Sequence, residues 1–360
     1  MTREERGWRI EDSGGGRSLL LSSILYLLSS LFFLPLTGCD RGATKNELVL
    51  YTSVDEPVAR PIVAEFTKRT GIRVALQTDT EANKSAGLVA RLEAERANPR
   101  ADVWWGNEVF RTIALAEARV LAPYESPSAK DVPDAFKDPA HRWAGSGQRV
   151  RVVAVHTNPG AREVNPLPSG SIEDLARPEL KGHIAIADPR AGTTSGHVAA
   201  LYVLWGDTKA EQFFRALRAN DVKVVGGNGD VATEAAKGTV WVGLTDNDDV
   251  ANAAAEGGHL SALVPDQGEG QIGTLTIPCT VALVTGAKHP EDAKKLVDYL
   301  LSAEVEKRLI DVKFARYSVR EGGGDADAGK VKRMKVDYNE VAKVLRRAAS
   351  SAHAILVGRE

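Results

Sequence analysis

Residues 47–105 read ELVLYTSVDEPVARPIVAEFTKRTGIRVALQTDTEANKSAGLVARLEAERANPRADVWW, and this stretch decides the fold class. Short apolar runs at 48–51, 72–76 and 102–105 predict buried strands. The amphipathic stretches between them, at 58–69 and about 85–97, predict helices. A β-α-β-α-β order predicts a parallel sheet covered by helices on both faces, in which ligands collect at the carboxyl ends of the strands.

A second series of strands and helices follows further along the chain. A longer apolar strand at 149–156 is interpreted as a crossing between two lobes. After it, the sequence predicts a strand at 184–187, helices from about 195–204 and 209–219, and strands near Val222 and Val240. The apolar run at 275–284 is then the return crossing, and it leads into a helix that begins at Pro290.

The N-terminus has the layout of an export signal. Arg17 precedes a mostly apolar run at 19–36, and Leu36-Thr37-Gly38-Cys39 closes it. A basic start, an apolar stretch and small residues before the cut predict a lipoprotein signal peptide over residues 1–38, with Cys39 as the lipidated first mature residue. The alternative is a transmembrane helix, because a run of this length can just span a bilayer.

Composition excludes several classes of protein. Hydrophobic residues make up 43% and charged residues 26% of the chain, which is typical of a globular protein. The net charge of -2 and the lack of a basic stripe argue against a nucleic acid partner. Cys39 and Cys279 are the two cysteines, so a lipidated Cys39 leaves Cys279 without a disulfide partner, and we interpret Cys279 as a small buried hydrophobe.

Several segments, taken in order, resemble the solute-binding proteins of ABC importers. They include Leu50-Tyr51-Thr52-Ser53, 65–74, Ala101-Asp102-Val103-Trp104-Trp105, 174–182 and 290–300. The resemblance covers nearly all of residues 47–312, and the ferric-iron-binding branch is the most similar. It implies a two-lobe, type II periplasmic binding protein fold of the α/β class, with two hinge-crossing strands and a ligand held in the cleft between the lobes.

The resemblance also implies a domain layout and a function. We expect residues 39–148 to form the first part of lobe 1, 149–276 to form lobe 2, and 277–360 to return to lobe 1 with the C-terminal helices. The expected function is that of a monomeric, lipid-anchored receptor outside the cytoplasm, which passes a small charged ligand to ABC permease subunits and catalyses nothing. An extracytoplasmic hydrolase and a sensor-coupled receptor are the alternatives from other classes.

The sequence departs from the iron-binding branch at the expected ligands. In that branch a histidine often follows the first strand, and here Asp55 stands there. Adjacent tyrosines bind iron in the second lobe, but the stretch after Gly243 reads Leu244-Thr245-Asp246-Asn247-Asp248-Asp249. Carboxylates also suit divalent cations. The first choice of ligand is still Fe³⁺, bound with an anion or as a chelate, and another metal ion can take its place; the alternative is a small anion such as a phosphonate or another oxyanion.

Carboxylates are the candidate metal ligands. Asp246, Asp248 and Asp249 follow a strand end, and such a group repels itself unless a cation or a basic side chain lies within it. Asp55, Glu56 and Glu108 are the candidates from the other lobe. The alternative is helix capping, by Asp248 or Asp249 in one lobe and by Asp55 or Glu56 in the other.

Small polar residues before predicted helices are the candidate anion ligands. The loop at 191–197 places hydroxyls and free backbone N–H groups at a helix start, where an anion is favoured. Capping without a ligand is the alternative. The candidates are Thr193, Thr194, Ser195 and Gly196 in this loop, with Ser53, Ser85 and Asn107 in the first lobe.

Overall fold

The structure is a computed structural model that describes residues 47–78, 86–157, 167–320 and 331–358. The strands are β1 Leu48–Thr52, β2 Val74–Thr78, β3 Val103–Gly106, β4 Leu121–Ala122, β5 Ala144–His156, β6 Ile184–Ala187, β7 Lys223–Val225, β8 Val242–Asp246, β9 Leu260–Leu263 and β10 Thr276–Val284. The α-helices are α1 Glu56–Thr70, α2 Ala86–Ala94, α3 Phe110–Glu117, α4 Gly192–Ala219, α5 Asn228–Ala236, α6 Asn247–Ala255, α7 Pro290–Leu300, α8 Ala303–Asp311 and α9 Tyr338–Val357.

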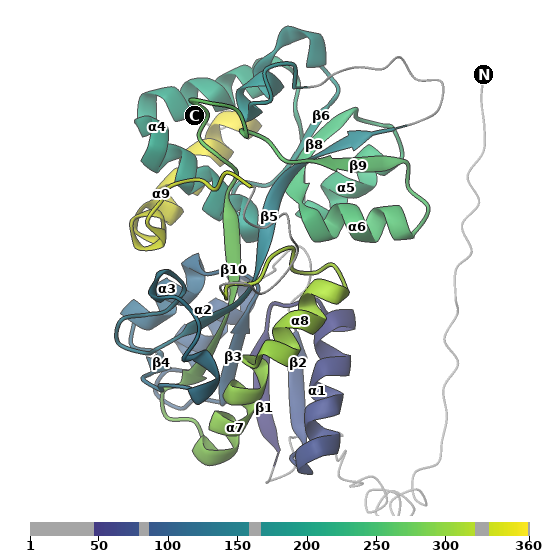
Figure 1. The fold of residues 1–360 in the computed structure, drawn as a ribbon. Helices are drawn as coiled ribbons and strands as arrows, with labels where there is room; N and C mark the ends of the chain where they lie inside the picture. Colours follow the sequence, from purple (N-terminus) through teal and green to yellow (C-terminus); the bar gives the residue numbers. More distant parts are fainter. Residues whose placement is uncertain (1–46, 79–85, 158–166, 321–330, 359–360) are drawn as a thin grey trace, which may run out of the picture. The chain divides into compact units, whose positions relative to one another are not determined.

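Two sets of parallel strands form the centres of two lobes (Figure 1). In lobe 1, β1 lies between β2 and β3 and pairs in parallel with both. In lobe 2, β6 lies between β7 and β8 and also pairs in parallel with both. The two-lobe α/β fold predicted from the sequence is confirmed, and the carboxyl ends of the parallel strands in each lobe are the places that can present a ligand site.

Strands β5 and β10 join the lobes. The first half of β5 pairs with β10, through Ala144 to Val150, and its second half pairs with β8, through Arg151 to Val155. Strand β10 also pairs antiparallel with β3 of lobe 1. The predicted crossings were 149–156 and 275–284. The second agrees closely with β10, whereas β5 begins five residues before the predicted crossing because Ala144–Gln148 also pair with β10.

Helix α1 shows why the sequence forms these elements. Its buried residues Ala59, Ile62, Val63 and Phe66 recur at helical spacing and pack on lobe 1 beside Leu50. The helix ends at Gly71, whose positive φ of 74° suits a residue without Cβ, and the Gly71 N–H donates to the Thr67 carbonyl.

The C-terminal helices divide between the lobes. Helix α7 packs on β10 and β3, and α8 contacts the first part of β5, in keeping with a return to lobe 1. Helix α9 instead packs along α4 of lobe 2 and also contacts α3 of lobe 1. This differs from the expected return of all C-terminal helices to lobe 1, because the buried side of α9 includes Val341, Ala348 and Ala352, which belong to the core that contains α4.

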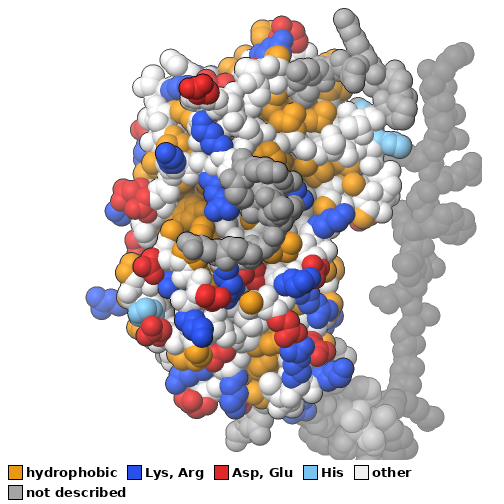
Figure 2. All heavy atoms as spheres, viewed as in Figure 1, with side chains coloured by type: hydrophobic (Ala, Val, Ile, Leu, Met, Phe, Trp, Pro, Cys, Tyr) orange, Lys and Arg blue, Asp and Glu red, His pale blue; other side chains and the backbone are white. Residues whose placement is uncertain are grey.

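Charged side chains of both signs are mixed on the face shown in Figure 2, with no large area of one sign. This distribution agrees with the small net charge of -2. It offers no basic stripe on that face for a polyanion.

Candidate functional site

Three aspartates gather where β8 ends and α6 begins, and all three are buried. Oxygens from Asp246, Asp248 and Asp249 lie within 4.8 Å of one another. The guanidinium of Arg149 lies among them, with its Nη2 2.9 Å from Asp246, 2.7 Å from Asp248 and 4.0 Å from Asp249. Arg151 adds a second positive charge, with its Nη1 2.8 Å from the other oxygen of Asp246. The acidic residues therefore already have cationic partners from the protein.

Both arginines come from the crossing strand β5, where they alternate with Val150 and Val152. Side chains two residues apart on a strand point to the same face, so the arginines face the aspartates and the valines face the other side. Our sequence analysis missed both arginines. The signal available in the sequence was that the two arginines lie two positions apart within an apolar strand. Charges on such a strand are buried, and a buried charge requires a partner of opposite charge.

Hydrogen bonds join the aspartates to the starts of α4 and α5. Thr193 Oγ1 donates to Asp246 Oδ2 over 2.5 Å, and Asn228 Nδ2 donates to Thr193 Oγ1 over 2.8 Å. Asn228 Oδ1 accepts from Arg151 Nη1 over 3.0 Å. Asn228 is thus a second residue that the sequence analysis missed, although the glycine-rich loop that contains it was noticed as a turn before a helix.

Burial and neighbouring charges decide the protonation of this cluster. Burial opposes the charge of Arg149, but the aspartates outweigh it and hold the pKa of Arg149 well above its usual value. Burial raises the pKa of Asp248 to about 6; Arg149 opposes the rise, and Asp246 and Asp55 add to it. For Asp246, Arg149 and Arg151 outweigh burial and keep the pKa below its usual value. Asp246 is therefore held in its charged form more firmly than Asp248.

A small pocket adjoins the cluster, and both lobes contribute to it. Helices α4 and α5 begin at it, and neither has an N-cap side chain that accepts from its first N–H groups. The first N–H groups of a helix have no acceptor within it, so the start of α4 presents donors and the positive end of a dipole. At α5 the Gly227 N–H donates to Asp230 Oδ2 over 3.1 Å. The residues that line the small pocket are Asn107, Arg149, Ala191, Gly192, Thr193, Gly227, Asn228 and Asp249.

Arg149 also lines this pocket. Its Nε and Nη2 donate to Asp248, and its Nη2 lies 2.9 Å from Asp246. The enclosed space is ≈ 10 Å³, about enough for one water molecule. A larger ligand must therefore enter while the lobes are further apart.

Lobe 1 contributes Asn107 to the pocket, as predicted from its position after β3. Ser53, after β1, donates through Oγ to Asn107 Oδ1 over 2.9 Å and accepts from the Asn107 N–H over 2.9 Å. Both residues are buried. Ser53 therefore orients Asn107, and it is not among the lining residues. Ser85 lies outside the described residues.

Two predicted metal ligands have other partners. Glu108 accepts from the N–H groups of Phe110 over 2.7 Å and Arg111 over 3.2 Å, so it caps the start of α3. Glu56 forms an exposed ion pair with Arg60 one turn along α1. Glu56 therefore has a partner within its own helix, whereas buried Glu108 caps α3 and also interacts electrostatically with Arg149 of the cluster. Capping was weighed as the alternative for Glu56, but not for Glu108.

Asp55 remains near the acidic cluster. Its charge acts on both Arg149 and Asp248. It is half-buried at the start of α1, and its side chain does not cap that helix. Asp55, like Glu108, is thus a lobe 1 carboxylate whose charge acts on the cluster.

The loop hydroxyls are used within lobe 2. Thr194 Oγ1 donates to Asn228 Oδ1 over 2.8 Å, and Ser195 Oγ donates to the Gly192 carbonyl over 2.7 Å. With the Thr193–Asp246 bond, these contacts give each of the three loop hydroxyls an acceptor within lobe 2. Gly196 has a packing role, because a Cβ there would lie 2.1 Å from Cε2 of Phe110 in α3.

Two further predictions concern the cysteines and the N-terminus. Cys279 is buried, and burial raises its pKa to about 12, so it is a packed thiol, as expected. Cys39 and the export segment lie outside the described residues. In the part of the chain that the structure describes, no helix combines the length and apolar character needed to cross a bilayer.

Comparison with known proteins identifies the family. Residues 48–311 match the family model described as bacterial extracellular solute-binding protein. An uncharacterized protein of Haemophilus influenzae is 30% identical over 268 residues, which cover 72% of this chain and 74% of that protein. Iron uptake protein A1 of Synechocystis is 28% identical over 282 residues, or 75% of each chain. A putative 2-aminoethylphosphonate-binding periplasmic protein of Salmonella typhimurium is 26% identical over 249 residues, or 69% and 70%.

Solved structures agree on the fold. Iron-bound HitA from Pseudomonas aeruginosa has a TM-score of 0.76 and 24% identity and covers 86% of this chain and 99% of its own. AfuA from Actinobacillus pleuropneumoniae, with fructose-6-phosphate bound, has a TM-score of 0.70 and 23% identity and covers 88% and 98%. Given the extent of the family match, this chain belongs to the bacterial extracellular solute-binding protein family.

Proposed function

We propose that this protein is the solute receptor of an ABC importer and that it binds a small oxyanion ligand, of the phosphonate or phosphate-ester class, between its lobes. One observation carries the proposal. The starts of α4 and α5 and the guanidinium of Arg149 line one pocket that also includes Asn107 of lobe 1. Converging N–H donors, helix dipoles and a guanidinium are the features that bind such groups.

Relatives support both the class and the ligand. Members of the family are binding proteins, and the curated relatives include periplasmic ones. The 26% identical Salmonella protein is described as binding 2-aminoethylphosphonate. A zwitterion of that kind suits a pocket lined by both Arg149 and Asp249, because its ammonium and phosphonate ends need partners of opposite charge.

Ferric iron, bound with an anion, is the second candidate. Three buried aspartates within 4.8 Å, with Asp55 nearby, favour a hard cation. The 28% identical Synechocystis protein is named for iron uptake. However, both oxygens of Asp248 accept from Arg149, and both oxygens of Asp246 are within 3 Å of a guanidinium. A ferric ion would have to displace Arg149, whereas an oxyanion would not.

The proposal includes the cellular setting predicted from the sequence. Cleavage before Cys39 and its lipidation would hold a monomeric receptor at the outer side of the cytoplasmic membrane, where it meets the permease. Metabolic labelling with a palmitate analogue tests this. Wild-type protein should take up the label, a Cys39→Ala variant should not, and equal labelling of both would contradict the anchor.

Calorimetric titration can separate the two ligands. Asn107→Asp adds one negative charge to the pocket and leaves the size of the side chain almost unchanged. Because the new charge repels an anion, the variant should bind 2-aminoethylphosphonate or phosphate at least about tenfold more weakly. It should leave ferric citrate binding unchanged or tighter. The matched control is Asn252→Asp on the exposed part of α6. An oxyanion affinity that is equal in Asn107→Asp and wild type, or that is absent from wild type, would refute the oxyanion proposal.

A further inference from the structure

Lobe 1 contacts lobe 2 directly at the start of α3. Phe110 is the first residue of this helix and is fully buried. Its ring lies against Gly196 near the start of α4, where a Cβ would be 2.1 Å from Cε2 of Phe110. The contact is beside the small pocket, because the pocket residues Asn107 and Thr193 each lie three positions before one of its members. A side chain at position 196 would exclude the ring, so the lobes meet here backbone against aromatic ring.

Two further contacts join the start of α3 to lobe 2. The rings of Phe110 and Tyr338 meet edge to face with their centroids 5.7 Å apart, and Tyr338 begins α9, which packs along α4 (Figure 1). The Tyr338 hydroxyl donates to the Thr276 carbonyl over 2.8 Å, which fixes its ring beside β10. Arg111 donates through Nη2 to the Arg190 carbonyl of lobe 2 over 2.9 Å. We call the contacts of Phe110 and Arg111 with lobe 2 the closure contact.

Glu108 positions both residues of the closure contact from within lobe 1. Its carboxylate accepts from the N–H groups of Phe110 and Arg111 over 2.7 and 3.2 Å, and its Oε1 lies 3.9 Å from Nε of Arg111. Hydrogen bonds to a charged group are stronger than those between neutral groups. The start of α3 is therefore held firmly while it faces the other lobe.

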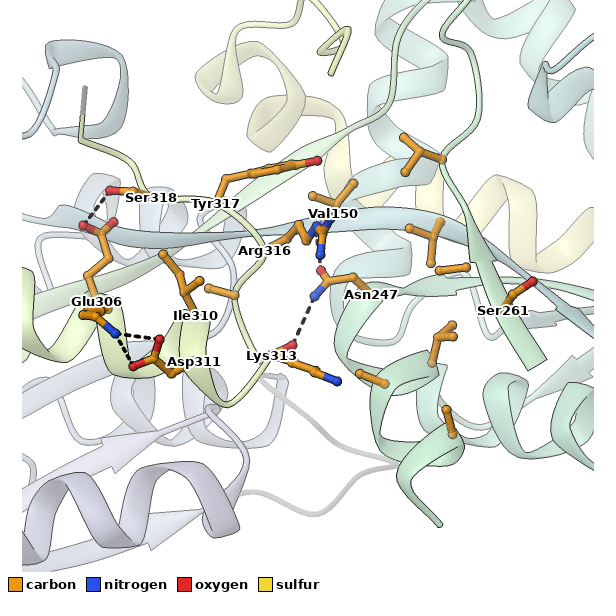
Figure 3. Close-up of a pocket in the computed structure, with 18 of the residues that line it drawn as sticks. Val150, Asn247, Ser261, Glu306, Ile310, Asp311, Lys313, Arg316, Tyr317 and Ser318 are labelled. Carbon is orange, nitrogen blue, oxygen red and sulfur yellow. Dashed lines mark hydrogen bonds and ion pairs between the residues drawn. The ribbon is translucent and has the colours of Figure 1, made fainter. Parts of the chain in front are cut away.

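The lobes are further apart on the opposite face of β5. A groove of ≈ 980 Å³ lies between them there, lined by Ile310 of α8 in lobe 1 and by Ser261 of β9 in lobe 2 (Figure 3). Val150 faces this groove, whereas the preceding Arg149 faces the pocket. The lobes are thus in contact on the pocket side of the crossing strand and separated on the other side.

The crossing strands contain an irregularity between the lobes. The pairing of β5 with β10 shifts register between Pro278 and Cys279, so Gly147 is an extra residue in β5, and its φ is 68°. A bulge bends a strand locally, and glycine adopts a positive φ without strain. This place in β5 is therefore suited to a change in the angle between the lobes.

We propose that Phe110 holds the lobes together on the pocket side and that its separation from Gly196 controls the entry and exit of ligand. The closure contact joins protein groups alone, so it does not require a ligand. Separation exposes the apolar ring to water, so loss of the ring favours the open arrangement. Its effect on the lobes is independent of the ligand, whereas its effect on ligand exchange rests on the oxyanion binding proposed above.

The distance between spin labels on the two lobes tests this proposal. Glu93→Cys in α2 of lobe 1 and Arg346→Cys in α9 provide exposed label sites on elements that flank α3. Cys39→Ala removes one native thiol, and Cys279 is buried. Without added ligand, protein with Phe110 should give one short distance with a narrow distribution.

Two variants of the closure contact should change that distance. Phe110→Ala should give a longer mean distance and a broader distribution. Arg111→Met removes one hydrogen bond at a half-buried position and should lengthen the distance by less. The matched control is Phe66→Ala, which removes a buried ring within lobe 1 and should leave the distance unchanged.

Stopped-flow mixing with 2-aminoethylphosphonate gives a second measurement. Its association and dissociation should both be at least about tenfold faster in Phe110→Ala than in wild type, because each step requires separated lobes. Phe66→Ala should exchange ligand at the wild-type rate. If wild type binds no 2-aminoethylphosphonate, the proposed function fails, while the label distances still decide the role of Phe110.

The proposal is overturned if Phe110→Ala and wild type give the same distance distribution. It is also overturned by an equal change in Phe66→Ala, which would assign the effect to lost core packing. Melting temperatures check the folding of each variant. If Phe110→Ala does not fold, Arg111→Met decides, and an unchanged distance in that variant would contradict the closure contact.

Discussion

Replacing Arg149 by methionine removes the cation that lies among three buried aspartates. Arg149 is 2% exposed and lies 2.7 Å from Asp248 and 2.9 Å from Asp246. Loss of one partner from a buried ion pair costs about 3–5 kcal/mol of the free energy of unfolding. At about 2 °C per kcal/mol, the melting temperature of Arg149→Met should fall by about 6–10 °C.

The destabilisation of Arg149→Met should depend on pH in a defined direction. Without Arg149, the pKa values of the aspartates rise above those in the unfolded chain, so the folded state binds more protons. Stability then falls as pH rises, and the loss should be larger at pH 8 than at pH 5. Mn²⁺ should raise the melting temperature of the variant by mass action and leave the wild type unchanged, because Arg149 holds the place of a cation.

Scanning calorimetry and urea titration provide the assay. Arg60→Met is the control, since Arg60 forms an exposed pair with Glu56 and should cost less than about 1 kcal/mol. Arg149→Met/Asp248→Asn should recover at least about 1 kcal/mol relative to the sum of the single variants. A loss below 1 kcal/mol for Arg149→Met, with no dependence on pH, would refute the reading of Arg149 as the cation of this cluster.

Three further predictions follow from single positions. Gly196→Ala should lower the melting temperature, because its Cβ would lie 2.1 Å from Cε2 of Phe110 and overpacking costs about 1–3 kcal/mol; an unchanged melting temperature would contradict this contact. Because burial raises the pKa of Asp248 to about 6, the folded state holds a proton there that the unfolded chain releases. The free energy of unfolding of wild type should therefore fall by up to about 3 kcal/mol as the pH rises from 4 to 6, and Asp248→Asn should flatten that slope in urea titrations. Iodoacetamide should label Cys279 in urea and not in native protein; rapid native labelling would show that the thiol is accessible.

Local sequence pattern was enough to predict the fold. Strand and helix periodicities in residues 47–105 and 184–244 correctly indicated two α/β units, because the spacing of apolar residues shows which face of each element is buried. The crossing strand and the position of the aspartates at the end of β8 were also predicted correctly, because strand ends lie at the ligand edge of a parallel sheet.

The chemistry of the site depended on residues that meet only in the folded chain. Arg149 is 99 positions from Asp248, so the composition of the acidic segment could not show whether its neutralising charge is a metal ion or an arginine. The role of Glu108 was mispredicted for a related reason. Its carboxylate caps α3 by accepting from the Phe110 N–H, and the sequence does not show whether a side chain points to such a local donor or into a distant cleft.

The sequence by itself determined two α/β lobes, their crossing strands and a group of acids at one strand end, because these follow from short-range periodicity. The tertiary structure alone decided that two arginines neutralise those acids, that two helix starts meet at one pocket, and that a separate groove opens behind the crossing strand. The physical reason is that charge pairing and pocket formation act through space over a few ångströms, between residues that the chain separates by up to about a hundred positions.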